Sequence, residues 1–155
     1  MNGRQEVDKL KKRLDATISR APSPTAEPEV QSDFAKYCCI LVSGFFENAV
    51  VALVLHYVEK RSAPEIASFV EAQLDRWTNP KADKLCNLLR AFNKDWGKQA
   101  EAYLVDERRD SINSLVALRH KIAHGESVQT SLSQVKSYKD VVYEVVEFVA
   151  TLTGQ

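Results

Sequence analysis

The residues best suited to chemistry lie together in the segment Leu118–Gly125, which holds two of the three histidines of this 155-residue chain. Arg119 and His120 are adjacent, Lys121 follows them, and His124 precedes a glycine. An imidazole can take up or release a proton near neutral pH. A guanidinium can bind a phosphate through two hydrogen bonds and stabilise developing negative charge. The segment contains no hydroxyl or thiol nucleophile, so it suits proton transfer on a substrate that brings its own nucleophile.

RNA is such a substrate, because its 2′-hydroxyl can attack the adjacent phosphorus. A base on that hydroxyl, an acid on the leaving 5′-oxygen and an arginine on the phosphate would cleave RNA without a metal ion or other cofactor. General acid–base catalysis contributes about 10²–10⁴-fold to such a rate. The acid and the base must lie on opposite sides of the phosphorus, which one short segment rarely arranges. A two-fold homodimer that brings two such segments face to face would arrange it.

Two simpler interpretations of the same residues stay open at this stage. Basic side chains at the end of a helix can bind its last free carbonyl groups, so Arg119, His120 and Lys121 could form a cap. His120 and His124, four residues apart, could hold a zinc ion. However, no acid or cysteine is visibly placed to complete such a site, and the metalloprotease spacing is absent. We therefore predict no metal site.

The helix that carries these residues is predicted to run from Asp106 to Ala123. Apolar residues recur in it at helical spacing, and it begins with acidic and ends with basic residues, as the helix dipole favours. Gly125 is expected to end it in the left-handed conformation. On an unbroken helix His120 and His124 are about 40° apart, whereas Arg119 and His124 are about 140° out of line. Unwinding of the last turn would let His124 approach Arg119.

The longest apolar run, from Cys38 to Leu55, lies in a segment with no proline between Glu29 and Arg61. It is long enough to cross a membrane, but Glu47 and Asn48 at its centre would be costly in lipid. We therefore predict a central core helix and no membrane partner. Ser43 and Glu47 lie about 40° apart on that helix. Their polar stripe is either a satisfied contact between helices or one wall of a site.

The composition indicates one ordinary globular domain. The chain is 45% hydrophobic, and its 21 basic and 21 acidic residues give a net charge of zero. A zero charge counts against a strongly basic nucleic-acid-binding surface, although not against a small basic site. The three cysteines have no metal-binding spacing and are expected to be reduced. The N-terminus has no apolar segment typical of a secretory signal, so we expect a cytoplasmic protein.

The sequence divides into three parts. Residues 1–20 predict a one-sided amphipathic helix. Residues 21–28 contain three prolines and predict a linker or sharp corner, and residues 29–155 predict the main helical domain.

Local signals place the other helix ends. Capping boxes are expected at Ser62–Glu65 and at Ser131–Gln134. Gly97 is expected to kink or end the helix that precedes it. The fold class is therefore all-α, a bundle of five or six helices.

The residues around Arg119 and His124 resemble the Arg-x4-His motif of the HEPN domain family. The similarity includes the apolar run Ser114–Leu118, the segment Ile122–Gly125 and the acidic centre of the upstream long helix at Phe45–Asn48. It is closest to the RiboL-PSP-HEPN branch or the related MAE_28990-type branch, and it covers most of residues 30–150. The resemblance implies a short helical bundle whose dimers form one cleft from two motifs.

The resemblance also implies an activity and roles for individual residues. Many family members are metal-independent endoribonucleases that act as toxins or in phage defence, and we expect the same here. Arg119 and His124 would be catalytic, His120 would be the supporting polar residue, and Glu47 would be a helper. Lys121 would join Arg119 in binding RNA. The alternative is a HEPN-like module that binds RNA, nucleotide or a protein without cleaving.

One position departs from the pattern of some HEPN toxins. These toxins carry a tyrosine two residues after the motif histidine, where a partner nucleotidyltransferase adds AMP. This chain has Glu126 there, so that mode of silencing is not implied. An antitoxin or regulatory protein is still an expected partner, beside RNA and the second copy of the chain.

Overall fold

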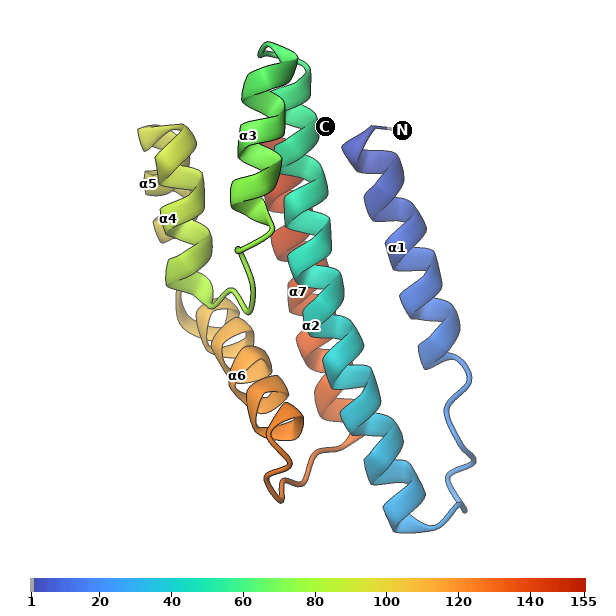
Figure 1. Ribbon diagram of the computed structural model, residues 1–155. Helices are drawn as coiled ribbons and strands as arrows, with labels where there is room; N and C mark the ends of the chain where they lie inside the picture. The colour runs from blue at the N-terminus through green and yellow to red at the C-terminus, as the bar shows by residue number, and fades with distance from the viewer. Residues whose placement is uncertain (1) are drawn as a thin grey trace.

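The long apolar segment forms α2 (Pro28–Glu59), the central helix on which α1, α3, α6 and α7 pack (Figure 1). The computed structural model describes residues 2–155, and this part of the chain is helical without strands. The other helices are α1 (Gly3–Ile18), α3 (Pro64–Leu74), α4 (Ala82–Phe92), α5 (Lys94–Tyr103), α6 (Asp106–Ala123) and α7 (Leu132–Leu152). The all-α prediction is confirmed.

α2 is the core helix that its central polar residues predict. It is the one helix within residues 2–155 whose length and composition would allow it to cross a membrane, and 56% of its apolar window is buried inside the molecule. Val42, Phe46 and Leu53 on this helix are fully buried. The apolar character of α2 is thus explained by the four helices that surround it.

α1 lies along α2 and contributes to the same apolar core through Val7, Leu14 and Ile18 (Figure 1). Polar contacts join it to α7 as well. Arg4 Nη1 lies 2.7 Å from Glu147 Oε2, and the Tyr143 hydroxyl donates a hydrogen bond of 2.6 Å to Asp15 Oδ1. This first helix is therefore packed on the body of the molecule at both of its ends.

Residues 2–155 form seven helices rather than the five or six predicted, because the chain breaks at Asn93. Asn93 has an extended backbone (φ −157°), and its side chain accepts hydrogen bonds from the amides of Asp95 and Trp96, which starts α5. The prediction that Gly97 kinks or ends a helix is wrong. Gly97 lies inside α5, where a Cβ atom would come within 2.6 Å of Arg90 Cβ on α4. Its missing side chain allows these two helices to touch.

One of the two predicted capping boxes is absent. Ala63 is the N-cap of α3, and within residues 2–155 no side chain caps that helix. Instead the Ser62 hydroxyl donates to the Val58 carbonyl at the end of α2. The other N-cap is formed, since Ser131 Oγ accepts a hydrogen bond of 3.1 Å from the Gln134 amide.

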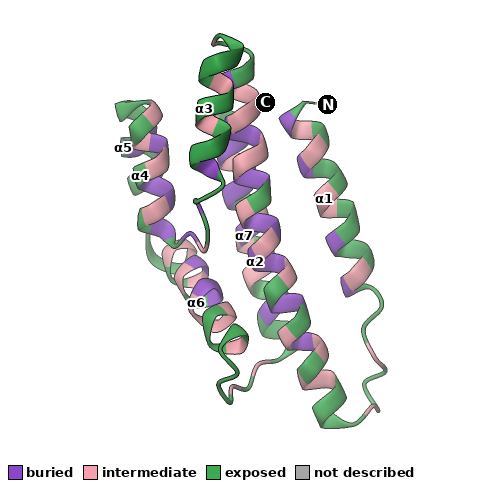
Figure 2. Ribbon diagram, viewed as in Figure 1, coloured by how far each residue is buried: buried purple, intermediate pink, exposed green. Residues whose placement is uncertain are grey.

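The arrangement of α2 and α6 decides where the motif lies. The C-terminal end of α6 and the N-terminal part of α2 lie at the same end of the molecule, and α3 lies at the opposite end (Figure 1). α3 is exposed over most of its surface (Figure 2). The motif end of α6 is also largely exposed, so its side chains face solvent.

Candidate functional site

Backbone hydrogen bonds already cap the end of α6. Gly125 adopts the left-handed conformation (φ 71°), as predicted. Its amide donates to the Ile122 carbonyl (3.1 Å), and the Glu126 amide donates to the Lys121 carbonyl (3.0 Å). This pair of bonds is the Schellman arrangement that satisfies the last carbonyl groups of a helix. The basic side chains of the motif are therefore not required as a cap.

His120 and His124 lie side by side on the exposed surface of this last turn. Their ring centroids are 4.2 Å apart, with the planes inclined at 53°. His124 is the C-cap, and its amide still bonds to the His120 carbonyl at 3.1 Å. The helix is thus intact through Ala123, and of the two geometries open from sequence the structure has the one that pairs the imidazoles. No group of three His, Cys, Asp or Glu side chains able to hold a metal ion occurs within residues 2–155.

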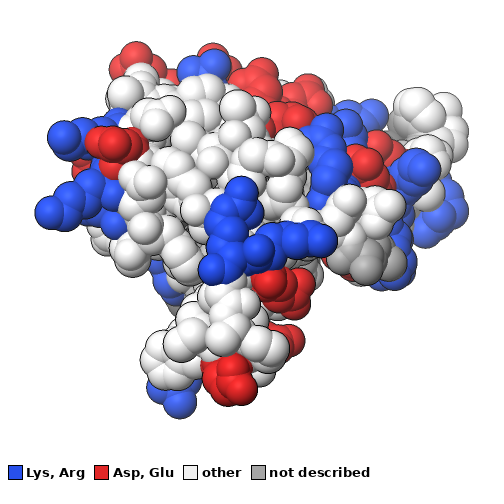
Figure 3. Space-filling model, turned by 90° about the horizontal axis from the view of Figure 1, so that it is seen from above, with Lys and Arg blue, Asp and Glu red and all other residues white. Residues whose placement is uncertain are grey.

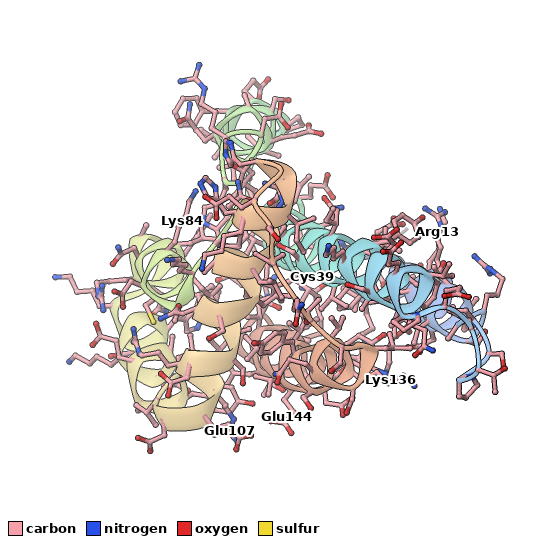
Figure 4. All side chains as sticks on the ribbon, turned by 90° about the horizontal axis from the view of Figure 1, so that it is seen from below. Arg13, Cys39, Lys84, Glu107, Lys136 and Glu144 are labelled. Carbon is pink, nitrogen blue, oxygen red and sulfur yellow. The ribbon has the colours of Figure 1, made fainter. Side chains whose placement is uncertain are left out.

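Arg119 points to a different side of α6, toward α2. Arg119 is close enough to Cys39, the residue of α2 labelled in Figure 4, for its charge to act on that thiol. Burial raises the pKa of Cys39 to about 11, and the positive charge of the nearby Arg119 opposes that rise. Arg119 is half-buried, and no hydrogen bond or ion pair to its side chain occurs in the described part of the chain. Its guanidinium is available for an anion.

Glu47 has a structural partner. Its Oε2 atom accepts a hydrogen bond of 2.9 Å from the amide of Asn79, in the connection between α3 and α4. The same connection is tied to α6, since the side-chain oxygen of Asn113 accepts from the Ala82 amide at 2.9 Å. Among residues 2–155 no hydrogen bond or ion pair joins Glu47 to the motif side chains. The structure therefore favours the interpretation of Glu47 as a satisfied contact between elements.

The connection held by Glu47 forms one wall of a pocket beside His120. The pocket has a volume of about 420 Å³. Its lining comes from both sides of a gap between the α3–α4 connection and the end of α6: Asn79, Lys81, Val116, Ala117, His120, Lys121 and Glu126. Of the residues predicted for the site, it brings together His120 and Lys121. Arg119, His124 and Glu47 are not part of its lining.

Sequence reasoning missed Asn79 and Lys81. They lie about 40 residues before the motif, so no spacing within the motif points to them. The one available signal is the Asn79–Pro80 pair, which is typical of a turn. That turn indicates a break between helices, but not which later helix it would face.

An all-helical bundle with an exposed arginine–histidine motif at the end of one helix is the arrangement expected of a HEPN domain. The RiboL-PSP-HEPN family model matches residues 4–154, which is nearly the whole chain. The protein therefore belongs to the RiboL-PSP-HEPN family. A comparison with curated proteins and with solved structures finds no match. Membership in the HEPN family suggests a ribonuclease-type or nucleotide-binding module.

Proposed function

We propose that the protein is a metal-independent endoribonuclease of toxin or defence type that works as a homodimer. The observation that carries this proposal is the motif at the end of α6, where His120 and His124 are paired and exposed and Arg119 has no partner within residues 2–155. The backbone caps the helix without these side chains. They are therefore available for a phosphate substrate.

The chemistry needs only these groups and the RNA. Arg119 binds the scissile phosphate through its guanidinium. One imidazole takes the proton of the 2′-hydroxyl as that oxygen attacks phosphorus. A protonated imidazole gives its proton to the leaving 5′-oxygen. The products are a 2′,3′-cyclic phosphate and a free 5′-hydroxyl, so water, metal and an enzyme nucleophile take no part in the step.

One copy of the chain cannot place both proton-transfer groups correctly. His120 and His124 share one face of α6, 4.2 Å apart, and so approach a phosphate from the same side. In-line displacement needs the base and the acid on opposite sides of the phosphorus. A second copy related by a two-fold axis supplies the second motif on the other side.

The surface for that second copy is proposed on the N-terminal half of α2. Tyr37 and Ile40 are exposed there, 53% and 37% respectively, at the end of the molecule that carries the motif (Figure 1). They flank an apolar groove of about 370 Å³ between α1 and α2. Ile40 directly follows Cys39, whose thiol is close to Arg119. This surface and the motif therefore lie at the same end of the molecule (Figure 1).

The charge distribution fits a local rather than a general RNA-binding surface. Figure 3 shows the end of the molecule opposite the motif, where acidic and basic side chains are interspersed around an area with neither. At the motif end, Lys81 and Lys121 line one pocket, and Arg119 lies near the same end of α6 on another side of that helix. Because the net charge is zero, these side chains would be the main attraction for phosphates.

The test is cleavage of single-stranded RNA by purified protein in the presence of EDTA. Wild-type protein should cleave and leave 2′,3′-cyclic phosphate ends. Arg119→Ala and His124→Ala should each reduce the rate by about 10²–10⁴-fold with unchanged thermal unfolding. His56→Ala is the matched control, since the third histidine lies on α2 away from the motif, and it should cleave normally.

A non-cleaving HEPN module is the second candidate, and the zero net charge is the observation that favours it. Wild-type protein that binds RNA but leaves it intact in EDTA and in Mg²⁺ would establish this second function. Activity that survives in both motif variants would remove the motif from the mechanism and with it the proposed ribonuclease site.

A further inference from the structure

The pocket beside His120 combines apolar residues with lysines. Its floor is apolar, formed by the buried Val116 and by Ala117, and exposed lysines stand at its rim. Its volume of about 420 Å³ falls in the range of about 300–1,000 Å³ that is typical of small-ligand sites. An apolar floor suits the face of an unstacked base, and lysines beside it suit the flanking phosphates.

Glu126 is the unexpected member of this pocket. It is exposed at the rim with Lys81 and Lys121, yet no ion pair or hydrogen bond to its carboxylate occurs in the part of the chain that the structure describes. Its backbone is fixed, because its amide donates to the Lys121 carbonyl at 3.0 Å. A carboxylate repels phosphate, so in an RNA-binding pocket it needs hydrogen-bond donors from the base.

We propose that this pocket binds a guanine base of the RNA substrate and that Glu126 recognises it, an inference that rests on the proposed ribonuclease function. Guanine presents two adjacent donors, N1–H and N2–H, on its Watson–Crick edge, and a carboxylate accepts both. Cytosine and adenine place an acceptor nitrogen beside their amino group, and uracil has one N–H between two carbonyls. A carboxylate is repelled by these acceptors, so it selects guanine from the four bases.

Asn79 adds a second polar group on the opposite wall. It lines the pocket, and its side-chain amide can donate to guanine O6. Its backbone is in the left-handed region (φ 50°), a conformation that asparagine adopts more readily than most residues. The hydrogen bond from the Asn79 backbone amide to the Glu47 carboxylate holds that wall in place. Glu47 is thus a positioning residue for the pocket.

Binding of modified oligonucleotides tests the inference without relying on cleavage. The probes are 2′-O-methyl pentamers with uracil at four positions and guanine, adenine, cytosine or uracil at the centre. They lack the nucleophile and so stay intact. Fluorescence anisotropy in EDTA should show that wild-type protein binds the guanine pentamer roughly tenfold or more tightly than the others, as expected for one bidentate contact to a base.

Substitutions at the two polar walls should change the preference in defined ways. Glu126→Gln offers one donor and one acceptor, which matches adenine, cytosine and uracil as well, so guanine affinity should fall about tenfold and the preference for guanine should be lost. Asn79→Gly permits the left-handed backbone and removes only the side-chain amide. It should reduce guanine affinity by a smaller factor than Glu126→Gln does. Glu71→Gln, an exposed glutamate on α3, is the matched control and should leave all four affinities unchanged. Thermal unfolding of each variant checks the fold.

The outcomes separate this inference from the proposed function. Equal affinity for the four pentamers, or a guanine preference that Glu126→Gln leaves intact, overturns the pocket assignment whether or not unmodified RNA is cleaved. A guanine preference that depends on Glu126 in a protein that cleaves no RNA supports the pocket and overturns the ribonuclease.

Discussion

At the scale of single residues, Glu47 is bonded to one wall of the pocket rather than to the motif side chains. Its carboxylate is half-buried and bonded to the amide of Asn79, which has a left-handed backbone and lines the pocket beside His120. A hydrogen bond to an ionised group contributes about 1.5–3 kcal/mol when well protected. Because Glu47 is partly solvated, we expect this hydrogen bond to contribute about 1–2 kcal/mol to the free energy of unfolding.

Two substitutions at Glu47 separate the structural from the catalytic role. Glu47→Ala removes the acceptor and should lower the free energy of unfolding by about 1–2 kcal/mol in urea titrations. Glu47→Gln keeps an acceptor for the Asn79 amide and should retain most of the stability and of the RNA-cleaving activity. A Glu47→Gln protein that folds normally but has lost cleavage would instead make Glu47 a proton-transfer group.

The sequence locates the motif well and the pocket poorly, for a physical reason. Arg119, His124 and the helix-ending Gly125 belong to one helix, and helical spacing alone places them relative to one another. The approach of Arg119 to Cys39 and of Asn79 to His120 depends on how separate helices pack. No local pattern in the chain encodes those distances.

At the scale of elements, the boundary between α4 and α5 also depends on packing between helices as well as on local residue types. Asn93 starts α5 by accepting two backbone hydrogen bonds, a signal available in the sequence as an N-cap residue. Glycine favours a helix break more strongly than asparagine does, yet Gly97 lies within α5. Its lack of a side chain permits the close contact with Arg90 on α4. Helices α2, α6 and α7 were predicted close to their observed limits, since long uninterrupted apolar periodicity dominates over single residues.

Two glycine substitutions test whether packing between helices or intrinsic helix propensity decides the stability effect of an added methyl group. Gly97→Ala places a methyl group 2.6 Å from Arg90 Cβ, so it should separate α4 from α5 and destabilise the protein by about 1–3 kcal/mol. Gly44→Ala is the matched control, because within residues 2–155 no atom beyond its own stretch of helix lies within 4 Å of the added Cβ. It should stabilise the protein by about 0.5–1 kcal/mol through helix propensity.

Urea titrations of both alanine variants at one protein concentration measure the difference, since association with a second copy would shift apparent stability. Equal effects of the two substitutions would mean that α4 and α5 can move apart freely, and the explanation given for Gly97 would then be wrong.

At the scale of the whole molecule, two exposed apolar surfaces lie at opposite ends. Tyr37 and Ile40 on α2 lie at the motif end, whereas Ile66 and Phe69 on α3 lie at the other end (Figure 1). Phe69 is the more exposed side chain, at 63% against 37% for Ile40. Exposure alone would therefore predict that a second copy binds at the α3 surface. The proposed composite cleft favours the α2 surface, because that surface lies at the same end of the molecule as the motif (Figure 1).

Ile40→Asp and Phe69→Asp decide between these surfaces. A carboxylate buried in an interface without a partner costs several kcal/mol, so Ile40→Asp should convert the proposed dimer to a monomer in light-scattering chromatography. Its cleavage of RNA should fall about 10²-fold or more, although Arg119 and His124 are intact in each copy. Phe69→Asp should remain dimeric and active. A monomeric Phe69→Asp, or an Ile40→Asp that is still an active dimer, would place the second copy elsewhere and remove the argument for a composite cleft at the end of α6.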